Sequence, residues 1–403
     1  MEEEATRSSK KARGAAGSGL TAFALRLAKH LAEEDGGVHK NLVLSPVSIH
    51  AALSLVAAGT RGTTLDELLA LLGAASRDEL AEFARAVAEG ALADRSVSDS
   101  DEPLVAFACA LWHEKAFALK PAYRAAAEES YRAKTRAVDF HNTPEKAVET
   151  INSWVSKVTK DLITSILPPG SVNSDTSLVI TNAIYFKGRW SMPFDTKDTE
   201  TRQFHLLDGS TVRVPFMLGP EDLPIAVHQG FKVLKLAYLP DNNGPRFFSM
   251  CVFLPGARDG LSGLLDRMAS SPNFLWDHLP ARCRETYEVW LPKFKLSFSS
   301  QINGVLQAMG MKAAFGIGKK ADLEDMLEGS LPLVVKHVFH KAVIEVDEEG
   351  TEAAASTACV MTLKSTSWPV SFVADHPFVF SVVEEVSGTV VFMGHVLDPT
   401  RSE

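Results

Sequence analysis

Serines and glycine-rich stretches are the first places to look for catalytic chemistry in this chain. A hydrolase nucleophile has the spacing Gly-x-Ser-x-Gly, and Gly260-Leu-Ser262-Gly263 lacks the residue between the serine and the second glycine. A phosphate-binding loop needs a glycine five residues before Gly318 and a hydroxyl residue after Lys319, but Ala313 and Lys320 occupy these positions. Neither motif supports a hydrolase or a nucleotide-binding enzyme.

Histidine serves both general acid–base catalysis and metal binding, and the chain has 12 histidines. His337 and His340 lie three residues apart in a segment that we expect to be a strand, so their side chains point to opposite faces. Such a pair does not readily share a metal ion, and structural roles are favoured for both. The sequence therefore predicts that the protein is not an enzyme and holds neither a metal ion nor a cofactor.

The segment of residues 351–363 is unusual because it contains neither proline nor glycine and consists mostly of small side chains. A turn or an ordinary loop is shorter and richer in those two residues. If the segment forms a strand, alternate residues point to opposite faces. One face then carries no charge and suits burial under a sheet, while the other face suits solvent. The uncharged face carries Thr351, Ala353, Ala355, Thr357, Cys359, Met361 and Leu363. An Ala-rich helix or a disordered linker explains the pattern equally well, so these alternatives stay open.

The elements that must position this segment divide into an α-rich and a β-rich part. Helices are expected at 20–32, from Pro46 (capped by Ser45) to 58, at 65–73, at 77–93 and from 142 to 168. Strands are expected at 178–186, 233–239, 247–254, 287–294 and 333–346, with a hairpin over 378–396. Helices that precede strands in this way predict an α+β fold. We expect residues 1–18 to form a disordered tail and residues 19–403 a single domain.

Charge and cysteine usage exclude several classes of partner. The net charge is −9, so the chain has no electrostatic footprint for nucleic acid. No stretch reaches the ~20 apolar residues that a membrane span needs. The acidic start is unlike a secretory signal, and the four dispersed cysteines predict that no disulfide forms. We expect a cytoplasmic protein with no nucleic-acid or membrane partner, and an extracellular location stays open.

Four separated motifs resemble one family, the serpins. Residues 348–355 match the family's hinge pattern, Glu-Glu-Gly-Thr-Glu-Ala-Ala-Ala. Residues 41–48, 181–190 and 372–378 with 394–399 are similar to its second-helix entry, its central strand and its C-terminal signature. The motifs occur in the family's order over nearly the whole chain, and residues 27–30 and 194–197 are more similar to plant members. The resemblance implies mainly N-terminal helices packed on three β-sheets, with a mobile reactive-centre loop at about 349–370.

The resemblance also implies a function, since serpins offer this loop to proteases as a suicide substrate and then insert it into the central sheet. Counting fourteen residues from Gly350 places the scissile bond between Lys364 and Ser365, with Leu363 and Lys364 setting specificity. Plant serpins often have Leu-Arg there, and lysine keeps the charge that a trypsin-like protease accepts. The implied partner is a trypsin-like serine endopeptidase, bound covalently 1:1 by a monomeric inhibitor. A basic-specific cysteine endopeptidase is an open alternative.

Further residues take their roles from the same resemblance. The hinge comprises Glu348, Glu349, Gly350, Thr351, Glu352, Ala353, Ala354 and Ala355. A polar network that controls opening of the sheet is implied at Ser45, Ser48, Asn182 and His340, with Trp190 near the sheet's end. Acids outnumber bases in residues 77–95, so we expect no heparin-like site. A non-inhibitory serpin acting as a binding or storage protein is the alternative, but the hinge carries no bulky or charged residue at its inward positions, which favours inhibition.

Overall fold

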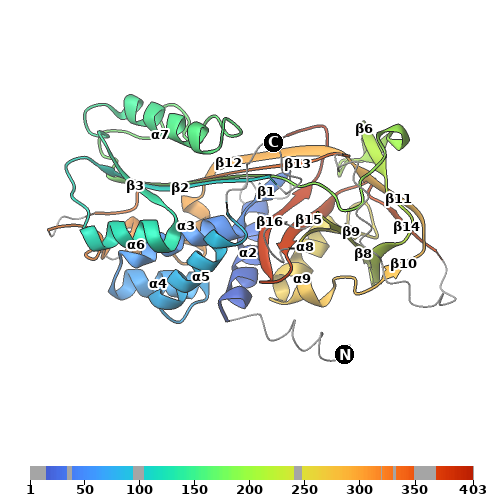
Figure 1. Ribbon diagram of the computed structural model, residues 1–403, viewed down its shortest axis with the longest axis horizontal. Coiled ribbons are helices and arrows are strands. Elements are labelled where there is room, and N and C mark those ends of the chain that lie inside the picture. Colours follow the sequence, from blue (N-terminus) through green and yellow to red (C-terminus); the bar gives the residue numbers. More distant parts are fainter. Residues whose placement is uncertain are drawn as a thin grey trace.

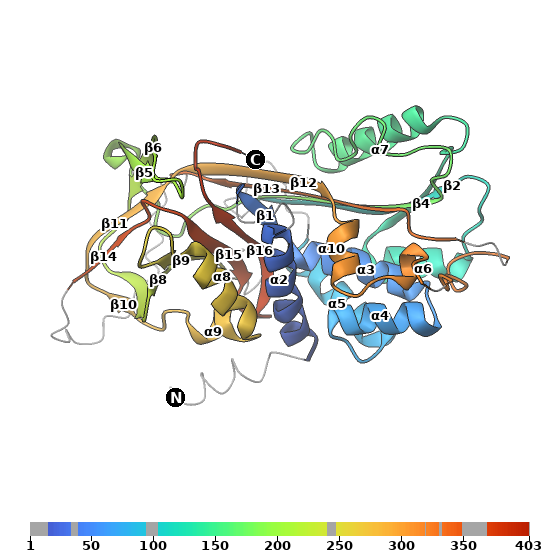
Figure 2. The same cartoon turned by 180° about the vertical axis from the view of Figure 1, so that it is seen from behind.

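The computed structural model describes residues 15–33, 39–93, 104–239, 247–318, 320–329, 333–348 and 369–402. Six of the described α-helices precede residue 160, and three short ones follow (Figures 1 and 2). The early helices are α2 (Ala15–Glu33), α3 (Pro46–Ala58), α4 (Gly62–Leu72), α5 (Arg77–Glu89), α6 (Pro121–Tyr131) and α7 (Pro144–Val158). The later helices are α8 (Leu261–Ser270), α9 (Phe274–Asp277) and α10 (Asn303–Ala308). Helix α2 includes four residues that sequence analysis assigned to the tail.

The described strands form three sheets. The five-stranded sheet has the order β12 (Phe294–Gln301), β13 (His337–Val346), β4 (Leu178–Lys187), β2 (Leu104–Glu114) and β3 (Lys134–Val138). The seven-stranded sheet has the order β1 (Leu42–Leu44), β16 (Thr389–Val396), β15 (Phe378–Glu384), β9 (Phe248–Pro255), β8 (Phe231–Ala237), β7 (Leu223–His228) and β10 (Cys283–Arg284). The four-stranded sheet has the order β14 (Val370–Val373), β11 (Thr286–Pro292), β6 (Thr211–Leu218) and β5 (Glu200–His205).

The five-stranded sheet is covered on both faces, as the apolar run of β4 predicts. One set of its side chains packs into a core with α7, and the opposite set packs into the main core, which extends from Leu20 to Leu397 and includes α3. Figure 1 shows α7 on one side of this sheet and α3 on the other. On the α7 side, the Trp112 indole donates to Thr181 Oγ1 at 2.8 Å and meets Trp154 edge-on. The central strands are therefore held from both sides.

Helix α3 follows the local rules that its sequence predicts. Ser45 has an extended backbone and its Oγ accepts from the backbone N–H of Ser48, while Pro46 occupies the first helical turn. Every residue from Pro46 to Ala57 is buried, because a helix that is apolar on all sides can lie only in a core. The cap of α3 is thereby fixed directly against the central sheet.

The bounds of one helix and the number of strands need correction. Helix α7 ends at Val158 rather than continuing to Pro168, because Lys160 and Asp161 adopt positive φ angles and the Thr159 side chain bonds the backbone of the turn. Strands β1 to β3, β5 to β7, β10, β12 and β14 were not expected; the Ala-rich run of β2, for example, shows no period of two. The segregation of helices before strands nevertheless confirms the α+β class.

Candidate functional site

The functional candidates that the structure describes gather along the boundary between β4 and β13, which we call the seam. These two strands pair directly and in parallel, from Val179 opposite His337 to Lys187 opposite Glu345. Strand β13 ends at Val346, two residues before the hinge begins at Glu348. Residues about 150 positions apart in the chain thus become neighbours at the centre of the sheet.

The four residues of the expected polar network meet at the middle of the seam. Asn182 and His340 are register partners on the two strands. Asn182 Oδ1 accepts from Ser48 Oγ at 2.7 Å and bonds His340 Nδ1 at 2.9 Å, while its Nδ2 donates to the Ser48 carbonyl at 2.8 Å. The Ser45 N–H donates to His340 Nε2 at 3.2 Å. The cap of α3 is therefore bonded to both strands of the seam.

This geometry fixes the proton on His340. Its Nε2 accepts from the Ser45 N–H, so the ring proton must lie on Nδ1, where it is donated to Asn182 Oδ1. Complete burial disfavours the charged ring and lowers the pKa of His340 to about 3. The imidazole is neutral at physiological pH, and protonating Nε2 would break the bond from Ser45.

A second group of contacts closes the seam where β4 and β13 both end. The Trp190 indole donates to the Asp347 carbonyl at 2.8 Å and stacks on Tyr238, with ring centroids 4.4 Å apart. Lys187 Nζ lies 3.0 Å from an Asp347 carboxylate oxygen and 3.5 Å from one of Glu345. The hydrogen bond and both ion pairs join the β4 side to the β13 side, so the end of the seam is fastened as well as its middle.

The carboxylate of the first hinge residue, Glu348, is held by two residues that are distant in the sequence. Its side chain is 8% exposed, accepts from Thr199 Oγ1 at 2.7 Å and lies 2.5 Å from Lys293 Nζ. Burial alone would raise the pKa of Glu348, but the bonds from Lys293 and Thr199 outweigh it and hold that pKa below its usual value. Sequence reasoning missed both partners because they come from segments that are distant in the chain.

The remaining bait and hinge residues lie outside the described residues. These are Glu349, Gly350, Thr351, Glu352, Ala353, Ala354, Ala355, Leu363, Lys364 and Ser365. The described chain ends at Glu348 after β13 and resumes at residue 369, one residue before β14. The segment is thus bounded by the five-stranded sheet at its start and by the four-stranded sheet at its end.

Comparison with known proteins decides what this arrangement is. A family model described as Serpin (serine protease inhibitor) matches residues 18–399. The chain belongs to the serpin family. Serpin-Z2A of Oryza sativa subsp. japonica is 55% identical, with 95% of this chain and 97% of that protein covered. Serpin-Z7 of Hordeum vulgare is 41% identical, with 95% and 96% covered.

Solved structures agree with the family and with the fold. Arabidopsis AtSerpin1 in its native stressed conformation matches this serpin with a TM-score of 0.89 at 39% identity, covering 96% of this chain and 98% of that chain. Uncleaved ovalbumin matches with a TM-score of 0.79 at 25% identity, covering 96% and 100%. The expected likeness to plant serpins and the expected fold are both confirmed.

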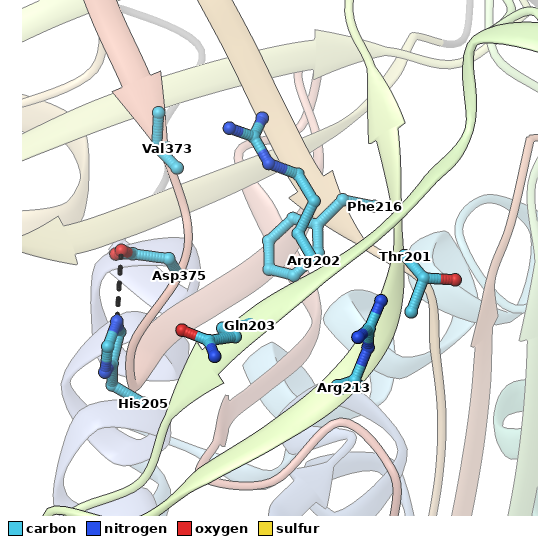
Figure 3. A pocket seen from close by; sticks show the side chains of 8 residues that line it. All are labelled: Thr201, Arg202, Gln203, His205, Arg213, Phe216, Val373 and Asp375. Atoms are coloured by element: carbon cyan, nitrogen blue, oxygen red, sulfur yellow. Dashed lines mark ion pairs between the residues drawn. The ribbon is translucent and has the colours of Figure 1, made fainter.

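A cavity of about 410 Å³ opens on the four-stranded sheet of this serpin (Figure 3). His205 Nε2 lies 3.9 Å from Asp375 Oδ2 there, a pairing that can orient a general base. Burial would raise the pKa of Asp375, but His376 and nearby positive charges hold it below its usual value. Thr201 carries the only hydroxyl among the described residues that line the cavity, and it lies four strand residues, ~13 Å, from His205. The lining of this cavity therefore offers the histidine no nucleophile.

The described part of the serpin contains neither a metal-binding cluster nor a membrane-spanning helix. No group of three or more histidine, cysteine or acidic side chains there could hold a metal ion. Within the same ranges, no helix combines the length and the apolar character that crossing a bilayer requires.

The cysteines differ in environment. Cys109 and Cys251 are buried free thiols, and burial raises the pKa of each to about 12. Cys283, which is partly exposed, takes part in a disulfide bond, whereas Cys359 lies outside the described residues. The expectation that no disulfide forms is therefore wrong for Cys283. Spacing along the chain cannot show which thiols folding brings together.

Proposed function

We propose that this serpin is a suicide-substrate inhibitor of trypsin-like serine endopeptidases, with Lys364–Ser365 as its bait. The observation that supports this most is the direct pairing of β4 with β13, because the chain leaves β13 to become the hinge. A segment that follows β13 and turns back runs antiparallel to both strands and fits between them once the seam opens. Insertion would replace one parallel ladder by two antiparallel ladders, which are slightly more stable per residue.

In the proposed reaction the protease's serine oxygen attacks the carbonyl carbon of Lys364, and the peptide bond to Ser365 breaks. The serine's proton passes through the protease's histidine to the leaving amine of Ser365, and Lys364 stays attached as an ester. Insertion of residues 351–363 at ~3.3 Å each carries that ester ~40 Å along the sheet. The protease is distorted, its deacylating groups lose their productive geometry, and the ester is trapped.

The proposed driving force is large enough for this work. About ten additional ladder hydrogen bonds at ~1 kcal/mol net would form, and burial of Met361 and Leu363 adds ~1.5–3 kcal/mol each. The sum is comparable to the ~5–15 kcal/mol stability of a whole domain. Two contacts of the seam, Asn182 with His340 and Trp190 with Asp347, oppose insertion until they break. They hold the intact protein in its uninserted state.

The test is to mix the protein with trypsin and examine the products by denaturing electrophoresis and mass spectrometry. We expect an SDS-stable complex of one inhibitor with one protease, and a released fragment that begins at Ser365. Lys364→Glu should abolish the complex because the acidic primary pocket repels it, whereas the matched variant Lys364→Arg should retain it. A Lys364→Glu protein that still traps trypsin would place the scissile bond elsewhere.

A further inference from the structure

Tyr287 stands out on the surface that adjoins the end of the bait segment. Its side chain is 79% exposed, more than any other large hydrophobic side chain among the described residues. Thr286 pairs with Val370 and Glu288 with Ser371, so a β-bulge leaves Tyr287 without a register partner. Bulges re-aim side chains out of the regular pleat. An aromatic ring is thus presented to solvent beside the first residues of β14.

The chain length between Lys364 and β14 keeps this ring close to the bait. Val370 follows Lys364 by six residues, so their Cα atoms are at most ~21 Å apart even when the chain is fully extended. A standard protein interface covers ~800 Å² on each partner, which corresponds to a disc with a radius on the order of 16 Å. A protease that holds Lys364 in its active site therefore reaches the start of β14 with the same interface when residues 364–370 span about 16 Å or less, which is short of full extension.

The strand that carries Tyr287 pairs with β14 on one side and with β6 on the other. Lys232 Nζ donates to the Ser371 carbonyl at 2.7 Å, which ties β8 to β14. On β11 itself, the Trp290 indole donates to Glu288 Oε2 at 3.1 Å. The backbone under Tyr287 is thus fixed before any partner arrives, so little conformational freedom is lost on contact.

The surroundings of Tyr287 have the composition of a contact surface. Arg282, Arg284 and Glu285 are exposed beside it and carry both signs of charge. A central aromatic ring within a polar rim is the usual anatomy of a protein interface, and tyrosine is among the residues that most often carry the binding energy.

We propose that Tyr287 is a secondary contact for the target endopeptidase, docking on the protease surface next to the pockets that hold the residues after the scissile bond. The proposal rests on the proposed function and adds to it a determinant of partner choice outside the bait. The contact would form when the protease first docks and would be lost after the loop inserts. It should therefore affect the rate of association and leave the later trapping step unchanged.

The test measures the second-order rate constant for inhibition of trypsin. Tyr287→Ala should lower this constant roughly tenfold, as truncation of an aromatic anchor does. Tyr287→Phe keeps the ring and should stay within about twofold of wild type. Ile317→Ala is the matched control, because Ile317 is also an exposed apolar residue. It follows a turn in which the Ala313 N–H donates to Glu67 of α4. Helix α4 lies at the other end of the molecule from β11 (Figure 1).

The stoichiometry of inhibition separates the two claims. A wild-type protein that forms no SDS-stable complex refutes the proposed function itself. If wild type traps trypsin and Tyr287→Ala associates within twofold of it, the Tyr287 contact is refuted while the function stands. A loss of rate in Tyr287→Ala with unchanged stoichiometry and unchanged thermal midpoint supports the contact. A loss shared by Ile317→Ala would overturn it.

Discussion

Replacing Asn182 by alanine should weaken the intact protein more than the cleaved one. Its side chain makes three buried hydrogen bonds, two with Ser48 and one with His340. Each contributes ~1 kcal/mol, and their buried partners are left partly unsatisfied, so the expected loss is about 3–5 kcal/mol. With an unfolding entropy of ~2.1 cal/mol/K per residue, this loss corresponds to roughly 4–6 °C in the thermal midpoint.

Cleavage changes this loss because insertion separates the strands of the seam. Neighbouring strands lie ~4.8 Å apart, so an inserted strand moves β4 and β13 to ~9.6 Å from each other. The 2.9 Å bond between Asn182 and His340 cannot survive that separation. The cleaved form has already lost this bond, and Asn182→Ala should destabilise it by ~1–2 kcal/mol less than the intact form.

The assay compares thermal and urea unfolding of intact and trypsin-cleaved protein. Asn152→Ala is the matched control, since Asn152 also makes three hydrogen bonds, all to the turn at Ile166 and Leu167 and none across the seam. It should destabilise intact and cleaved protein equally. Equal shifts for Asn182→Ala in the two forms would refute the account of the seam.

Two further predictions concern buried side chains. Burial lowers the pKa of His340 to about 3 and those of His50 and His395 to about 4. Below pH ~6.5 the unfolded state therefore binds more protons than the folded state, and the protein becomes less stable as the pH is lowered. Urea unfolding should show that the free energy of unfolding is roughly 6 kcal/mol lower at pH 5 than at pH 7, and His340→Gln should reduce this difference by about a third. Equal free energies of unfolding at the two pH values would contradict the burial argument. Because burial also raises the pKa of Cys109 and Cys251 to about 12, both thiols should resist iodoacetamide at pH 8 in native protein and react after unfolding in urea. Equal native and unfolded rates by peptide mass spectrometry would show that these thiols are accessible.

Local patterns predicted much of the fold. Ser45 and Pro46 before an apolar run predicted the first turn of helix α3. The continuous apolar stretch 178–186 predicted a strand covered on both faces, and this strand is β4. The order of four family motifs indicated the rest of the architecture. The same motifs named Ser45, Ser48, Asn182 and His340, and the structure brings these four together.

Contacts between distant segments could not be predicted. The anchoring of Glu348 needs Lys293 and Thr199, and no local pattern links these three residues. The exposure of Tyr287 depends on a bulge that arises only when β11 pairs with β14. The disulfide of Cys283 likewise follows from tertiary proximity. The monomeric state and the cytoplasmic location stay predictions.

Loop insertion at the seam is the central claim, and the reaction of Thr351→Arg with trypsin tests it most directly. Thr351 is the first inward position of the hinge, and arginine there must be buried without a partner at a cost of several kcal/mol. The variant should be cut after Lys364 at a normal rate and yield little covalent complex, because hydrolysis of the ester outruns insertion. Glu352→Arg, with its charge on the solvent side, should still inhibit. If Thr351→Arg traps trypsin as completely as wild type, insertion into the seam is not how this serpin works.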